Sequence, residues 1–292
     1  MHKLISFFLL AGITISNFTY ADVQVIDDFG LKVTLNKPAK RIISLAPHAT
    51  EQLFAAGAGQ QIVAVVKYSD YPDAAKTIES IGSYRSIDIE RIVALKPDLI
   101  VAWPSGNKQK AVDKLKALGL NVYQSQPEEI LQIAESIEKL GVLSGHGVHA
   151  KKSAMVFRQE YDQLRTQYAN KKTVRLFYQI WNKPIMTING SHLISKVMGL
   201  CGGENVFAEL SASAPKLDVE AVIQRNPEVI IASGMSEERP EWLDEWRQWK
   251  AMQAVKQNKL YFIPPDIIQR HSPRILQGAA QLCEHLEHAR QS

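Results

Sequence analysis

Short apolar runs alternate with amphipathic segments along the first half of the chain. The runs are a few residues long and end at polar or turn-forming residues, which is typical of buried strands. They cover residues 41–45, 62–67, 99–103 and 121–124, with helices predicted at Ala49–Ala56 and Lys108–Leu118. Strands that alternate with helices predict a parallel, doubly wound sheet. Ahead of them, Val23–Leu35 alternates around a turn at Gly30 and predicts a β-hairpin.

The same alternation returns in the second half of the chain. Strands are predicted at Thr173–Gln179, 229–232 and Lys259–Ile263, and helices at Leu193–Leu200 and Ser272–Ala289. Between the halves, Gly145–Asn170 places apolar residues at helical spacing and contains no Gly or Pro after Gly147. This stretch predicts a single helix of about 20 residues, which is about 30 Å long at the usual rise per residue.

These patterns predict two doubly wound α/β lobes that are joined by one long backbone helix, with a ligand cleft between the lobes. The predicted organisation is a signal peptide at 1–21, an N-terminal lobe at 22–143, the linking helix at 144–170 and a C-terminal lobe at 171–292. Because a single stiff helix connects the lobes, we expect small rocking motions rather than wide closure.

Two segments that lie 130 positions apart are nearly copies of one another, Ile89–Ala102 and Val219–Ala232. Each predicts a short helix that is opened by an acid and stopped at a proline, then a second acid and a strand. A single recurrence at one long interval indicates a duplicated lobe, because the repeats of a solenoid recur every few tens of residues. Glu90 and Glu220 hold the same place in the two copies and suggest a partner with two-fold-like symmetry. The helix dipole, which favours a carboxylate there by about 0.3–1 kcal/mol, is an alternative explanation.

The N-terminus has the features of a secretory signal. Lys3 precedes an uncharged apolar run, Leu4–Ile15, and small or polar residues follow as far as Ala21. This order predicts a signal peptide that is cleaved near Ala21. The run is shorter than the roughly 20 apolar residues that span a bilayer. No cysteine lies near the cleavage point, so a lipid anchor is not expected, and we predict a soluble periplasmic protein.

The net charge and the two cysteines bear on the expected partners and on the redox environment of the protein. The net charge is only +4 over 292 residues, and no basic stripe is interleaved with aromatic residues, so nucleic acid is not an expected partner. The two cysteines, Cys201 and Cys283, lie in an exported chain and therefore predict a disulfide, with two buried thiols as the alternative. No metal-ligand spacing surrounds either cysteine.

The residues that follow the predicted strands define a candidate site, because open α/β sheets bind ligands beyond the carboxyl ends of their strands. They are Pro47, His48, Tyr68, Trp103, Trp181, Ser233, Gly234 and the segment 264–268. This set is aromatic and carries little charge, which suits a large apolar ligand with a few polar groups. Core packing is the alternative for each aromatic residue. His48 could contact the ligand or coordinate a metal within it, although a polar wall residue is the commoner role.

Enzymatic motifs are not found in the sequence. It contains no Gly-x-Gly-x-x-Gly, Gly-x-Ser-x-Gly or His-Glu-x-x-His pattern, and the glycines of 199–203 follow a predicted helix instead of a strand. A lobed metalloenzyme or hydrolase would require a metal cluster or a nucleophile–base pair at the strand ends. We therefore predict a binding protein that is not an enzyme.

Several motifs resemble those of a known family. They are the opening pattern from Gly30 to Glu51, the Tyr-Ser-Asp-Tyr-Pro run at 68–72, the copied segment from Glu90 with Ala102-Trp103, the Cys-Gly-Gly-Glu-Asn run at 201–205 and Arg270-x-Ser-Pro-Arg. Together they are similar to the periplasmic substrate-binding proteins with a helical backbone, which deliver cobalamin, haem and iron-siderophores to ABC importers. The last four motifs resemble the cobalamin-binding members, and the likeness covers about residues 22 to 288.

The resemblance implies roles for individual residues. Tyr68 and the loop from Asp266 to Arg270 match ligand contacts, and Glu90 and Glu220 match acids that dock onto permease arginines. Cys201 and Cys283 match the disulfide of the family. With the strand-end residues, the predicted ligand contacts are Pro47, His48, Tyr68, Tyr84, Trp103, Trp181, Asp266, Ile267, Ile268, Gln269 and Arg270.

The sequence departs from the family pattern at the predicted cleft. Tyr84 stands where a Trp is expected, and Ile267-Ile268 stand where a Trp-Phe pair is expected, so the cleft is less aromatic. Cobalamin would be bound as the transported ligand by a monomer, with no cofactor and no protein metal site.

Haem and a ferric siderophore are the alternative ligands on the same scaffold. Haem requires an axial His or Tyr, for which His48, Tyr68 and Tyr84 are candidates. An anionic siderophore requires several cleft arginines, and only Arg85 and Arg270 are well placed.

Overall fold

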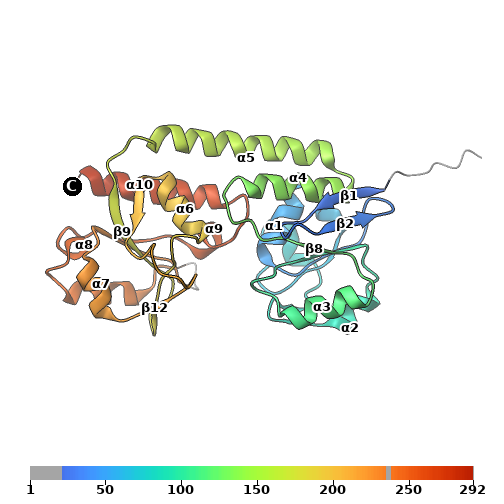
Figure 1. Cartoon of the computed structure of the whole chain (residues 1–292), viewed down its shortest axis with the longest axis horizontal. Coiled ribbons are helices and arrows are strands. Elements are labelled where there is room, and N and C mark those ends of the chain that lie inside the picture. The colour runs from blue at the N-terminus through green and yellow to red at the C-terminus, as the bar shows by residue number, and fades with distance from the viewer. Residues whose placement is uncertain (1–21, 235–237, 292) are drawn as a thin grey trace, which may run out of the picture.

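The computed structural model describes residues 22–234 and 238–291, so the predicted signal peptide lies outside the described residues. Two four-stranded parallel sheets lie side by side, each in its own lobe, and one long helix passes over both lobes (Figure 1). The strand orders are β4-β3-β7-β8 and β11-β9-β13-β14. If the four strands of each sheet are numbered in chain order, the first pairs with the second and the third, and the third also pairs with the fourth. The predicted fold class and the duplication are therefore confirmed.

The N-terminal lobe runs from β1 to α4. Its elements are β1 Val23–Ile26, β2 Lys32–Leu35, β3 Ile42–Ser44, α1 Pro47–Ala55, the 3₁₀ turn η1 Gly59–Gln61, β4 Ile62–Ala64, η2 Asp73–Thr77, β5 Gly82–Ser83, β6 Ser86–Ile87, α2 Ile89–Ala94, β7 Leu99–Ala102, α3 Gln109–Ala117, β8 Val122–Gln124 and α4 Gln132–Ser144. The predicted hairpin is present as antiparallel β1 and β2. Helix α4 was not predicted, although Ile133, Ile137 and Leu140 recur at helical spacing and are fully buried.

The C-terminal lobe runs from β9 to α10. Its elements are β9 Val174–Gln179, β10 Ile185–Met186, α6 Leu193–Leu200, β11 Gly203–Asn205, β12 Lys216–Leu217, α7 Val219–Arg225, β13 Val229–Ala232, η3 Glu241–Gln248, α8 Gln253–Lys256, β14 Leu260–Phe262, α9 Pro265–Ile268 and α10 Ile275–Gln291. The disulfide between Cys201 and Cys283 is present, as predicted, and joins the end of α6 to α10.

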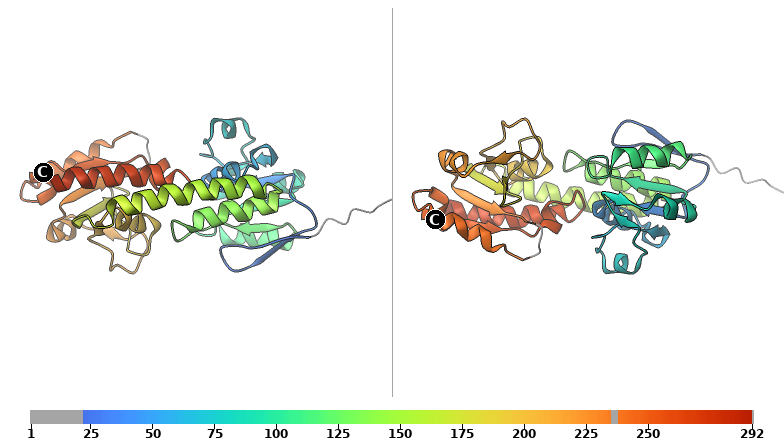
Figure 2. Two further views of the ribbon diagram at one scale, coloured as in Figure 1. Left: turned by 90° about the horizontal axis from the view of Figure 1, so that it is seen from above. Right: turned by 90° about the horizontal axis from the view of Figure 1, so that it is seen from below.

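The predicted long helix is α5, Gly147–Tyr168, which has 22 residues. Seen from above, α5 extends from the N-terminal lobe, where it lies beside α4, to the C-terminal lobe (Figure 2). The chain turns between α4 and α5 at Gly145, whose φ of 80° favours glycine. One apolar cluster includes residues of both lobes together with Ala150, Ala154 and Phe157 of α5. The lobes therefore share part of their core through this helix.

The two copied segments fold alike, and the structure explains most of their shared residues. Asp88 and Asp218 cap α2 and α7 by accepting hydrogen bonds from the backbone amides of Arg91 (2.9 Å) and Ala221 (2.8 Å). The residues before the two prolines, Lys96 and Asn226, have φ values of 47° and 45°.

The second acid of each copy joins the copied strand to its neighbour. The carboxylates of Asp98 and Glu228 accept hydrogen bonds, each of 2.9 Å, from the backbone amides of Arg41, just before β3, and Arg175, within β9. These acids, the caps and the prolines are therefore structural. Glu90 and Glu220 are different, because both are exposed and neither takes part in these structural contacts within the described part of the chain.

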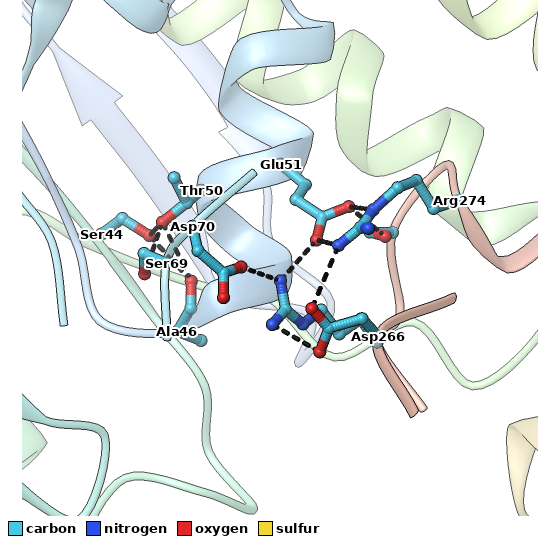
Figure 3. Close-up of polar contacts among 10 residues, drawn as sticks. Ser44, Ala46, Thr50, Glu51, Ser69, Asp70, Asp266 and Arg274 are labelled. Carbon is cyan, nitrogen blue, oxygen red and sulfur yellow. Dashed lines mark hydrogen bonds and ion pairs between the residues drawn. The ribbon is translucent and has the colours of Figure 1, made fainter. Parts of the chain in front are cut away.

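The lobes are joined by a buried carboxylate in the middle of helix α1. Glu51 of α1 is only 3% exposed. It accepts hydrogen bonds from Arg270 (3.0 Å), from Ser272 (2.7 Å) and from two nitrogens of Arg274 (2.7 and 2.9 Å) (Figure 3). All three donors belong to the C-terminal lobe. We call Glu51, Arg270, Ser272 and Arg274 the interlobe latch.

Further contacts hold the latch in place. Arg270 also pairs with Asp70 (2.7 Å) and Asp266 (2.6 Å), and Arg274 lies over the ring of Tyr71 at 4.0 Å. Beside the latch, the side chain of Gln52 donates to the backbone carbonyl of His271 across the lobe boundary (2.7 Å). Buried, multiply bonded ion pairs of this kind resist water and salt far more than exposed pairs do.

We expect Glu51→Gln to destabilise the protein by about 3 kcal/mol or more, because two largely buried guanidinium groups lose their shared counter-charge. Glu129→Gln is the matched control, since Glu129 bridges the lobes to Lys196 at 2.9 Å but both side chains are well exposed. That control should cost less than about 1 kcal/mol. Urea unfolding followed by circular dichroism measures both, and equal losses would contradict the role of the latch.

Candidate ligand cleft between the lobes

A cavity of about 520 Å³ lies between the carboxyl ends of the two sheets. Both lobes line it, through Trp103, Ser105, Gln126, Pro127 and Glu128 on one side and Ile180, Ile188, Ser191, His192, Leu193, Ile194, Ser213, Gln269 and His271 on the other. Its volume is within the usual range for small-molecule sites, and the strand-end position is where α/β sheets bind ligands. Of the charged residue types, Glu128 alone contributes to this lining.

Trp103 is the aromatic wall of the cavity on the N-terminal lobe, as its position after β7 predicts. Its ring centroid lies 5.4 Å from that of Tyr84 and 5.3 Å from that of His48. A side chain on Gly106 would come within 1.9 Å of the indole, so glycine is required there. Asn107 closes the loop by accepting a hydrogen bond from the backbone amide of Trp103 (2.7 Å).

Three histidines from distant parts of the chain meet at the cavity. The ring of His271 lies 5.9 Å from that of His48 and 6.2 Å from that of His192. Burial lowers the pKa of His48 and of His192 to about 4. Burial also lowers the pKa of His271 to about 3, and the neighbouring imidazoles add to this effect. All three rings are therefore neutral at physiological pH, and they act as polar, uncharged wall residues.

The predicted ligand residues are distributed unevenly around this cavity. Trp103 and Gln269 line it directly, and Tyr84 packs behind Trp103. Pro47 is half-buried at the start of α1, next to His48, which is only 4% exposed and packs against Trp103.

Other predicted contacts lie outside the lining. Tyr68 is 68% exposed and Trp181 is 42% exposed. Asp266 and Arg270 are engaged in the ion pairs around the latch. Ile267 is half-buried, and Ile268 is completely buried in the core of the C-terminal lobe, so we do not carry Ile268 into the proposed contacts.

Sequence reasoning missed several lining residues. Gln126 and Pro127 lie two and three residues after the end of β8, and this position just beyond a strand is the signal that could have identified them. His192 and His271 were not predicted either, because their spacing in the sequence matches no ligand pattern. They are brought together by the fold, since His192 precedes α6 and His271 follows α9.

A second cavity, of about 580 Å³, lies beneath α5 between Phe54 of α1, Phe157 of α5 and Arg274. It contains none of the predicted ligand contacts and is not at the strand ends. We therefore place the ligand site at the cavity between the sheets. Within residues 22–234 and 238–291, no group of three or more His, Cys, Asp or Glu side chains is arranged to hold a metal ion. No helix in the same ranges is both long and apolar enough to cross a membrane.

Comparisons with known proteins agree with this architecture. Residues 42–267 match the model of the periplasmic binding protein family. The chain is 42% identical over 255 residues to the vitamin B12-binding protein of Vibrio parahaemolyticus, which covers 86% of this chain and 91% of the relative. A relative of the same name from Yersinia pestis is 42% identical over 248 residues, or 85% of this chain and 86% of the relative.

Solved structures show the same fold. The crystal structure of the periplasmic vitamin B12-binding protein of Vibrio cholerae matches with a TM-score of 0.81 and 41% identity, and covers 87% of this chain and 99% of that one. A periplasmic haem-binding protein from Roseiflexus shares the fold, with a TM-score of 0.75 at 19% identity over 86% of this chain and 99% of that one. The long match to the family model and the close relatives show that this chain belongs to the periplasmic binding protein family.

Proposed function

We propose that this protein captures cobalamin in the periplasm and delivers it to the permease of an ABC importer. The observation that carries the proposal is an interlobe cavity at the strand ends in a chain that is 42% identical to vitamin B12-binding proteins along nearly its whole length. The protein would act by binding alone, as a monomer without a cofactor. Export would use residues 1–21 as a signal peptide cleaved near Ala21.

The chemistry of the cavity fits a neutral macrocycle with amide side chains. Trp103, Ile180 and Leu193 supply apolar surface for a corrin face, and the neutral histidines supply polar groups without charge. Tyr68 and Trp181, which are exposed, would contact the ligand from the rim of the cleft. A cleft that is held rigidly by the latch and α5 loses little conformational entropy on binding.

The alternative ligands fit less well. An anionic siderophore needs free arginines, but Arg270 is paired with Glu51, Asp70 and Asp266. Haem needs an axial ligand, and the buried Nε2 of His48 lies on a ring that packs against Trp103 and His271. Tyr68 and Tyr84 remain as axial candidates.

Titration of the purified protein from Asp22 onward with cyanocobalamin tests the ligand. We expect stoichiometric binding by calorimetry and an absorption spectrum with the lower base still on the cobalt, because His48 is buried behind Trp103. Haem serves as the competing ligand. A shift of the Soret band with haem and no heat with cobalamin would replace cobalamin by haem on the same scaffold.

We further propose that Glu90 and Glu220 dock onto the permease. Both are exposed near the starts of matching helices, one on each lobe. Two equivalent acids on a duplicated scaffold suit a partner built from two similar subunits. Such exposed charges mainly set the orientation and rate of association.

The double variant Glu90→Ala, Glu220→Ala should lose cobalamin uptake through its cognate importer in proteoliposomes, while its affinity for cobalamin changes by less than about twofold. The matched control replaces Asp113 and Glu284 with Ala in the same way, since they are also exposed acids, one on each lobe, and this control should keep normal uptake. Normal uptake by the Glu90, Glu220 variant, or a large loss of cobalamin affinity, would contradict docking through these residues.

A further inference from the structure

Buried polar atoms without a hydrogen-bond partner gather at one point of the cleft. Among the described residues, Nε2 of His48, Nε1 of Trp103 and Nδ1 of His271 have no partner. The ring of His48 contacts both of the others, at centroid distances of 5.3 Å to Trp103 and 5.9 Å to His271. Each such atom costs about 1–3 kcal/mol when it stays unpaired, so a cluster of them requires an explanation.

The hydrogen bonds on the far sides of the two imidazoles define which nitrogen is protonated. Hydrogen bonding to the backbone at Pro127 acts to raise the pKa of His271, against the larger effect of burial. Since proline has no amide hydrogen, the imidazole must donate to the carbonyl oxygen, which leaves the unpaired Nδ1 with a lone pair. Hydrogen bonding to the backbone at Ser125 likewise acts to raise the pKa of His48, as it does when the imidazole donates. The unpaired Nε2 of His48 is then an acceptor. The unpaired nitrogens of the two imidazoles are therefore both acceptors.

Two donors lie beside these acceptors. The indole nitrogen of Trp103 can only donate. Nδ1 of His192 accepts a hydrogen bond from the backbone amide of Ile194 (3.2 Å). In the neutral ring of His192 the hydrogen is therefore on Nε2, which is a donor. Trp103, His192 and His271 all line the cavity, and His48 packs against Trp103 and His271 behind them.

We propose that His48, His271, Trp103 and His192 form a subsite that recognises a primary amide of the ligand and rejects a carboxylate. A primary amide has two N–H donors, which match His271 Nδ1 and His48 Nε2. Its carbonyl oxygen has two lone pairs, which match the N–H groups of Trp103 and His192. A carboxylate has no hydrogen to donate and would place a negative charge against two lone pairs in a buried, neutral environment.

This subsite deepens the proposed function, because a corrinoid carries primary amides around its periphery. It would distinguish fully amidated corrinoids from those in which one side chain is a carboxylate. The unpaired atoms of His48, Trp103 and His271 are not exposed to solvent, so the amide reaches them only when the ring of Trp103 or His271 turns toward the cavity. An ordered water, which also has two donors and two acceptors, is the competing occupant.

Calorimetry with cobalamin and its separated monocarboxylate isomers, in which one side-chain amide is hydrolysed, tests the subsite at pH 7.5. We expect at least one isomer to bind about tenfold more weakly than cobalamin or worse, since a site built for a hydrogen-bonding group strongly rejects an analogue that leaves its polar atoms unpaired. In His271→Phe, cobalamin should bind more weakly, and the ratio of the dissociation constant of that isomer to that of cobalamin should fall below about threefold.

Two further variants serve as controls. His271→Asn keeps a donor for Pro127 and an acceptor for the ligand, so it should retain most of the discrimination. His285→Phe removes another buried histidine with an unpaired Nε2, which stacks on Tyr261 away from the cavity, and it should leave the ratio unchanged.

The outcomes separate the subsite from the proposed function. Equal affinities of the wild-type protein for cobalamin and every monocarboxylate would overturn the subsite. It would also be overturned if His271→Phe kept the wild-type ratio of the two dissociation constants, which is the result expected if the site holds an ordered water only. Failure of the wild-type protein to bind cobalamin at all would overturn the proposed function, and the subsite with it.

Discussion

Glu51 places a carboxylate from the N-terminal lobe among three donors of the C-terminal lobe, where it is nearly inaccessible to water. An ionised group in such a position is stable only while its partners stay in place, because an uncompensated buried charge is far more costly than an exposed one. Separating the lobes at this point would therefore leave both the carboxylate and the guanidinium groups of Arg270 and Arg274 without partners. The geometry of the cleft depends on this constraint.

Helix α5 and the interlobe latch together hold the two lobes. Helix α5 shares its apolar face with the cores of both lobes, so it resists bending at the boundary between them. The latch, formed by the C-terminal lobe around Glu51, adds a second attachment near α1. Two attachments restrict the relative rotation of the lobes more than one does. The cavity between the sheets is consequently preformed, and most of the ordering cost of ligand binding is met when the protein folds.

Much of this fold could be predicted from local patterns. Apolar runs between amphipathic segments identified all four strands of the N-terminal sheet and three of the four in the C-terminal sheet, where the short edge strand β11 was not predicted. The recurrence of Ile89–Ala102 at Val219–Ala232 identified the duplication. The role of Trp103 as a cavity wall followed from its place at a strand end. These features depend on residues that are close together in the sequence, or on a periodicity that each segment shows by itself.

The rest depends on contacts that the sequence does not reveal. Arg270 was predicted only as a ligand contact, and its hydrogen bond to Glu51, which is 219 positions away, depends on the fold. The histidines have no recognisable spacing, because their proximity comes from the packing of the two lobes. Ile268 follows β14 in the sequence, as a ligand residue would, yet it lies at the end of α9 and is completely buried. In each case tertiary packing, rather than local pattern, decides the role of the side chain.

The central claim is that the latch and α5 hold the two lobes in one arrangement, with or without ligand. Spin labels on Lys114→Cys in α3 and Gln224→Cys in α7 report the separation of the lobes, and the native cysteines are in the disulfide and do not react. The account predicts a single narrow distance distribution by pulsed electron resonance, which shifts by less than about 2 Å at saturating cobalamin. A broad or two-peaked distribution that collapses on adding cobalamin would contradict it.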